Sequence, residues 1–142
     1  MPEFLELHSK TSKLLRAAAD AAVQRHGLRL GQDYLLAALW AADGRTPGEI
    51  AASVKVTTPA VTKLATRLAE AGLLERRPDA RDHRLVRLWL TPAGRALQQP
   101  VEEERQRLED RITATLTKTE RAQLLKALAK IHRALADDIL TP

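Results

Sequence analysis

Residues 46–91 read TPGEIAASVKVTTPAVTKLATRLAEAGLLERRPDARDHRLVRLWLT, and this stretch decides the fold. Threonine stands just before proline, or three residues before glutamate, where a helix is expected to begin, because its hydroxyl can cap the free N–H groups of a first turn. The pattern predicts helices over 47–53 and 59–71. After Gly72 come short runs rich in Leu, Val and Trp, which predict an antiparallel hairpin joined by the polar stretch 77–84.

The order of these elements, two short helices with a turn at 55–57 and then a hairpin, is that of a winged helix-turn-helix. The apolar positions of the second helix fall on one arc and leave a polar face opposite. An ordinary amphipathic surface helix has the same arc. The place of the predicted helix between a helix-turn and a basic hairpin nevertheless favours a DNA-reading helix, because hydroxyl and cationic side chains reach phosphates and base edges. The candidate contacts are Thr58, Pro59, Thr62, Lys63, Thr66 and Arg67.

The tip of the hairpin is rich in arginine. A narrow minor groove concentrates negative potential, so an arginine on an extended loop can enter it, and Arg81 in the middle of the tip is the candidate. Phosphates would repel Asp79 and Asp82, so at least one of them is expected to pair with a neighbouring arginine and hold the shape of the loop. By composition alone, an exposed charged turn is the simpler explanation. The candidate wing residues are Arg77, Asp79, Arg81 and Arg84.

The positive charge of the chain lies in this same segment. The formal net charge is +5, and residues 1–44 and 96–142 each hold equal numbers of basic and acidic residues. Residues 45–95 hold ten basic residues against five acidic ones. A local excess of this kind is expected of a surface that neutralises DNA phosphates, and a solvated basic face explains the charge alone equally well.

The predicted fold class is mainly α (α+β), because helices are also expected on both sides of the central segment. These helices are predicted over 4–26, 32–43, 92–115 and 118–140. Narrow apolar stripes in the last two suit helix pairing, either within one chain or between subunits, and the long terminal pair favours a dimer. The stripes are Leu97, Val101, Leu108 and Ile112, then Leu124, Leu128, Ile131, Leu135 and Ile139. The expected division is a dimerisation helix at 1–30, a winged helix-turn-helix DNA-binding lobe at 31–91 and C-terminal dimerisation helices at 92–142.

Composition excludes several classes of protein. The chain has no cysteine, so disulfides, thiol redox sensing and cysteine-based metal sites are excluded. The longest uncharged apolar stretch, 34–42, is far short of the ~20 residues of a membrane span, and the N-terminus lacks the pattern of a secretory signal. A cytoplasmic protein without a membrane partner is expected. No phosphate loop or catalytic motif is present, and the histidines lack metal-ligand spacing, so we expect neither an enzyme, a metal nor a cofactor.

Several stretches together resemble the multiple-antibiotic-resistance regulator (MarR) family of winged-helix proteins. They are Leu36 and Leu39, Glu49-Ile50-Ala51, Val61-Thr62, then Leu68, Glu70, Gly72 and Leu73, the wing motif Asp79-x-Arg81-x-x-Arg84, and Leu90-Thr91-Pro92-x-Gly94. The resemblance implies a homodimer formed by N- and C-terminal helices, with two winged domains on a palindromic operator. It also implies that Arg81 enters the minor groove and that Asp79 braces the wing.

Many members of that family are repressors that release DNA when a small aromatic acid or phenolic molecule binds between the lobes. The residues able to hold such an effector here are His8, Arg16, Tyr34 and Trp40, although packing also explains Tyr34 and Trp40. The alternative function is a winged-helix module that binds protein, or organises DNA without strong sequence preference, and senses no ligand. For a two-fold dimer, the operator is expected to be a pseudo-palindrome with half-sites about 10 base pairs apart.

Overall fold

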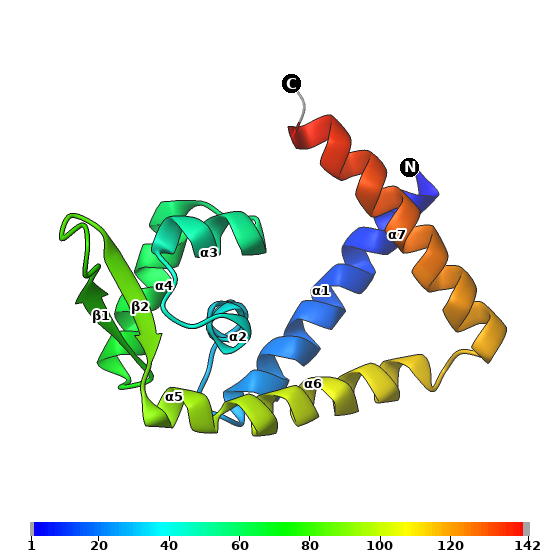
Figure 1. The fold of residues 1–142 in the computed structure, drawn as a ribbon. Coiled ribbons are helices and arrows are strands. Elements are labelled where there is room, and N and C mark those ends of the chain that lie inside the picture. Colours follow the sequence, from blue (N-terminus) through cyan, green and yellow to red (C-terminus); the bar gives the residue numbers. More distant parts are fainter. Residues whose placement is uncertain (1, 141–142) are drawn as a thin grey trace. The chain divides into compact units, whose positions relative to one another are not determined.

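The computed structural model describes residues 2–140, and for residues 138–140 it describes the backbone alone. The elements are α1 (Glu3–Gln24), α2 (Gln32–Ala41), α3 (Pro47–Val54), α4 (Thr58–Glu70), β1 (Leu74–Pro78), β2 (Val86–Leu90), α5 (Pro92–Ala96), α6 (Gln98–Thr113) and α7 (Lys118–Leu140) (Figure 1). The mainly helical winged helix-turn-helix fold is therefore as predicted. The side chain of Ile139, and the predicted domain ends at 1 and 141–142, lie outside the described residues.

The structure departs from the predicted helix boundaries at several points. The single helix predicted over 92–115 is divided into α5 and α6 at Leu97, because Pro100 has no N–H to donate to the preceding turn and is tolerated only in the first turn of a new helix. α2 ends at Ala41, and the next residue is already extended. Thr57, not Thr58, caps α4, accepting the Ala60 N–H at 3.3 Å.

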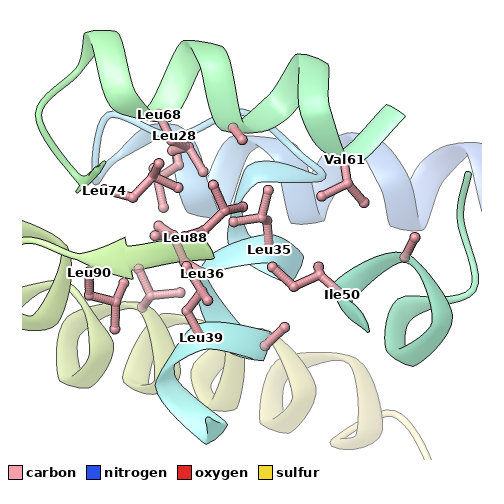
Figure 2. Close-up of a cluster of buried hydrophobic side chains, with 14 of the residues drawn as sticks. Leu28, Leu35, Leu36, Leu39, Ile50, Val61, Leu68, Leu74, Leu88 and Leu90 are labelled. Atoms are coloured by element: carbon pink, nitrogen blue, oxygen red, sulfur yellow. The ribbon is translucent and has the colours of Figure 1, made fainter. Parts of the chain in front are cut away.

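The chain forms two compact units, residues up to Gln106 and residues from Arg107 onward. The hydrophobic core lies in the first unit, with α2 at its centre (Figure 2). Leu35, Leu36 and Leu39 of α2 are at most 1% exposed, because this helix is apolar on most of its surface and is covered from several sides. α3, α4, the hairpin and α6 contribute Ile50, Val61, Leu68, Leu74, Leu88, Leu90 and Val101.

The hairpin is a two-stranded antiparallel sheet in which Leu74 pairs with Leu90 and Pro78 with Val86. Alternation along β2 buries Leu88 and Leu90 and leaves Arg87 and Trp89 on the other face. β1 lies beside α4 (Figure 1). The apolar face of the hairpin therefore completes the core against α4, and its tip extends beyond the core.

The second unit consists of the end of α6 and of α7. Leu124, Leu125, Leu128 and Leu135 of α7 are exposed in the single chain. Arg121 of α7 lies 3.7 Å from Glu109 of α6, an exposed ion pair. None of the helices within residues 2–140 combines the length and the apolar character that a membrane span requires.

Candidate nucleic-acid interface

The polar face of α4 is exposed, as a DNA-reading helix requires. Thr58, Pro59, Thr62, Lys63 and Arg67 are exposed, and Thr66 is partly buried. The hydroxyls of Thr62 and Thr66 donate to main-chain carbonyls one turn back in the same helix, at 3.1 and 3.0 Å. With their protons used in this way, the two threonines offer other partners only acceptor lone pairs.

The opposite face and the preceding turn hold α4 in place. Val61, Ala65 and Leu68 are buried, which confirms the predicted apolar arc. Lys55 ends α3 in a left-handed conformation with φ 57°, and Val56 then donates its N–H to a carbonyl of α3 at 3.1 Å. α4 is thus fixed by its inner face and by a tight turn, and its outer face is left to solvent.

Asp79 organises the wing. Its Oδ2 accepts the main-chain N–H groups of Arg81 and Asp82 at 3.0 and 2.8 Å, and its Oδ1 accepts Nε of Arg87 at 2.6 Å. The Arg87 hydrogen bond, followed by the two main-chain N–H groups, lowers the pKa of Asp79 to about 2. The carboxylate therefore stays ionised and closes the loop. The prediction that a wing aspartate pairs with an arginine is confirmed.

Arg87 is a wing residue that was not predicted from the sequence. Its Nη1 donates to the carbonyl of Gly44 at 2.9 Å and lies 3.4 Å from Oε1 of Glu49. Together with the bond to Asp79, these contacts tie the wing to the loop before α3 and to the first turn of that helix. The only signal in the sequence was an arginine inside a strand of otherwise apolar residues.

The other predicted wing residues differ in whether their side chains already have an acidic partner. Arg84 donates from Nε to Asp82 at 3.0 Å, and this partner lowers the pKa of Asp82. Arg77 donates to Glu75 at 3.0 Å and lies 5.6 Å from the ring of Trp89. The Arg81 side chain is exposed, with no carboxylate paired to it among residues 2–140. Of the three arginines, Arg81 is the one whose guanidinium has no acidic partner in the described chain.

Tyr34 is the one residue of the four effector candidates that lines a pocket between α2, α3 and α4. This pocket has a volume of about 310 Å³ and is lined by Gly31, Tyr34, Leu35, Ile50, Val54, Val56, Val61 and Leu64. His8 and Arg16 are exposed on α1, where His8 stacks on Phe4. Trp40 packs against the core, and its Nε1 donates to the carbonyl of Gly94 at 3.0 Å. The phenol of Tyr34 is the single polar side chain of the lining.

A buried carboxylate holds the start of α2 near the same pocket. Asp33 is 1% exposed, accepts the Gly31 N–H at 3.0 Å and pairs with Nη1 of Arg105 at 2.9 Å. The guanidinium of Arg105 also lies 5.3 Å from the centre of the Tyr34 ring. One arginine of α6 thus orients both the buried acid and the tyrosine.

The histidines do not gather into a metal site. His26 lies 3.4 Å from Oε1 of the buried Glu104, and His8 faces Ser12 on its own helix. Over the part of the chain that the structure describes, residues 2–140, no three histidine or carboxylate side chains are grouped to hold a metal ion.

Comparison with known proteins agrees with this architecture. A family model described as the MarR family matches residues 26–85. An HTH-type transcriptional regulator of Mycobacterium bovis is 31% identical over 93 residues, which are 66% of this chain. The match spans 64% of the length of that relative. The HTH-type transcriptional repressor MdtR of Bacillus subtilis is 29% identical over 116 residues, 82% of this chain and 75% of the relative.

The fold has a solved counterpart in complex with DNA. The structure of the MepR–DNA complex of S. aureus matches with a TM-score of 0.84 at 26% identity, over 92% of this chain and 97% of that chain. The family match covers α2, α3, α4 and the wing up to Leu85, which are the elements that carry the candidate interface. Over α2, α3, α4 and the start of the wing, the chain is therefore similar to the MarR family of winged-helix transcriptional regulators.

Proposed function

We propose that this protein is a sequence-specific transcriptional regulator that binds double-stranded DNA through α4 and the wing. The observation that carries the proposal is the distribution of ion pairs between residues 45 and 95. Four of the five acidic residues there, Glu49, Glu75, Asp79 and Asp82, are paired with arginines of the same segment. Lys63, Arg67 and Arg81 have no such partner among the described residues.

This distribution leaves the charges of Lys63, Arg67 and Arg81 available, and it neutralises every carboxylate of the segment except that of Glu70. Each cation that neutralises a phosphate releases a condensed counterion, so affinity is expected to fall steeply as salt rises. The N-terminal residues of a recognition helix contact base edges, which gives Lys63 a base-reading role and Thr58 and Thr62 supporting contacts. Arg81, at the exposed tip, enters the minor groove. The solved complex of the similar protein MepR with DNA supports DNA binding by this fold.

We further propose that the regulator is a homodimeric repressor of a pseudo-palindromic operator. α1 and α7 each expose apolar side chains in the single chain, including Phe4 and Leu14 on α1 and Leu128 and Leu135 on α7. Exposed apolar surface of this extent is typical of a subunit interface. A two-fold dimer places two copies of α4 on half-sites about 10 base pairs apart. The repressor role is supported by the relative MdtR.

The effector of this repressor is proposed to be a small aromatic molecule that enters the pocket beside Tyr34. The lining has no charged side chain, so burying a carboxylate there would be costly, whereas a phenol can share a hydrogen bond with the tyrosine. A neutral phenolic compound therefore fits better than an aromatic acid. Phenol and benzoate form a matched pair of probes, and phenol is expected to release DNA at the lower concentration.

Selection of bound sequences from a random duplex pool tests the main proposal, with the selected duplex titrated at two salt concentrations. We expect an enriched pseudo-palindrome whose affinity falls steeply with salt. Lys63→Ala should relax the base preference at one position by ~1–3 kcal/mol, and Arg81→Ala should weaken binding. Lys13→Ala, on the exposed surface of α1, is the control with the same charge change. Salt-sensitive binding with no enriched sequence would instead indicate an architectural protein, and no binding would indicate a protein partner.

A further inference from the structure

Arg76 and Arg77 are neighbours on β1 but have different surroundings. Strand alternation places them on opposite faces of the hairpin. Arg77 donates to Glu75 at 3.0 Å, so its charge already has a partner. Arg76 donates from Nη2 to Oγ1 of Thr66 on α4 at 2.6 Å. Arg76 therefore lies along the outer face of the recognition helix, although the sequence had favoured Arg77 as the DNA contact.

Thr66 is committed to holding this arginine. Its hydroxyl proton is donated to the carbonyl of Thr62 at 3.0 Å, and its oxygen accepts from Arg76. Arg76 uses one of its five N–H groups in this bond and keeps the other four. Its side chain is exposed, and no carboxylate pairs with it within residues 2–140. A guanidinium is thus oriented beside α4 with most of its donors unused.

We propose that Arg76, positioned by Thr66, binds a DNA phosphate at the edge of the groove that α4 enters. This inference rests on the proposed function. Thr66 lies in the C-terminal half of α4, whereas base edges are contacted from the N-terminal part of a recognition helix. Guanidinium and phosphate form short, bidentate hydrogen bonds, and such contacts fix the register of the protein on the duplex. Arg76 is therefore a backbone contact, and Thr66 is a positioning residue.

The test compares Arg76→Ala with Arg77→Ala, which remove the same charge from adjacent positions. The selected duplex and a scrambled duplex are titrated with each full-length protein between about 50 and 200 mM salt. Arg76→Ala should weaken binding to both duplexes about tenfold. It should also make the slope of log affinity against log salt less negative by about 0.9 for each bound protomer. Arg77→Ala should keep the slope of the unmodified protein.

Two variants of Thr66 test the positioning role. Thr66→Val removes the acceptor and should change the slope in the same direction as Arg76→Ala, whereas Thr66→Ser keeps the hydroxyl and should restore it. Equal slopes for Arg76→Ala and the unmodified protein would overturn the phosphate contact, as would an effect confined to one base pair. Normal binding by Thr66→Val would overturn the role of Thr66. If the unmodified protein binds no DNA in the first titration, the proposed function fails. If it binds DNA and only the variants depart from expectation, the inference about Arg76 and Thr66 fails alone.

Discussion

Nε of Arg87 lies 2.6 Å from Oδ1 of Asp79, and the two side chains join the strand β2 to the loop at the end of β1. The same guanidinium donates to the carbonyl of Gly44 at 2.9 Å. Because Asp79 also accepts two main-chain N–H groups of the wing, this one pair connects the wing to the body of the lobe. The shape of the wing therefore depends on the ionised form of Asp79.

Acid should loosen the wing through Asp79. Its pKa is lowered in the folded protein to about 2, from an ordinary value of 3.8, so its contribution to stability is complete above about pH 4 and is lost as the pH falls towards 2. Asp79→Asn should lower the Tm at pH 7, and the difference from the unmodified protein should shrink below pH 4. Thermal unfolding followed by circular dichroism at pH 7, 4 and 3 measures this, with Glu70→Gln as the control. A Tm difference that is constant down to pH 3 would contradict the role of the charge.

Gly44 should not tolerate a side chain, whereas Gly27, which has a similar left-handed backbone conformation, should tolerate one. Gly27 and Gly44 have φ of +77° and +72°, but a Cβ at Gly27 meets open space, whereas one at Gly44 would overlap the ring of Trp89. Gly27→Ala should cost about 1 kcal/mol from backbone strain alone. Gly44→Ala should cost about 1–3 kcal/mol more, because the packed ring must move. Urea unfolding of both variants checks this, and equal losses would show that the Trp89 contact is easily relieved.

The sequence predicted the fold well because its signals are local. Thr46 and Glu49 form the expected capping box, and Thr117 and Glu120 form another. Each cap needs only residues within one turn, so spacing is enough to find it. The break at Leu97 was missed because Pro100 stands inside an otherwise helical pattern, and the sequence alone does not show whether such a helix kinks or restarts.

The site was less predictable because its contacts join residues far apart in the chain. The Arg87–Gly44 and Arg105–Asp33 contacts span 43 and 72 positions, and no spacing rule links such partners. The choice between Arg76 and Arg77 likewise depends on which strand face meets α4. Trp40 was an effector candidate by residue type, but its indole N–H is already bonded to Gly94. Residue type indicated the surface, and only the packing distinguished the roles of the individual side chains.

Removing Arg105 should destabilise the first unit by leaving a buried charge without its partner. Asp33 is 1% exposed and depends on Nη1 of Arg105 at 2.9 Å for its ion pair. Arg105→Met keeps much of the aliphatic stem and should cost about 1–3 kcal/mol in the free energy of unfolding, because Arg105 is half exposed and Asp33 keeps the Gly31 N–H. Arg16→Met, on the exposed face of α1, should cost less than 0.5 kcal/mol. Equal losses of unfolding free energy for the two variants in denaturant would show that solvent replaces the contact of Arg105 with Asp33.

A charge on the apolar surface of α1 or α7 should separate the proposed dimer and, with it, DNA binding. Leu14 is 73% exposed and Leu128 is 44% exposed in the single chain, so a glutamate at either position costs the monomer little. In a two-fold dimer each substitution occurs twice, and losing two buried leucines removes roughly 3 kcal/mol or more of association free energy. Light scattering should therefore give a monomer mass for Leu14→Glu and Leu128→Glu, and a dimer mass for the control Ala52→Glu on the exposed surface of α3. Because one α4 contacts only half of an operator, the monomeric variants should bind the selected duplex far more weakly while keeping their circular dichroism spectrum. If a variant remains dimeric and binds DNA normally, the helix that carries the substitution does not lie in the dimer interface.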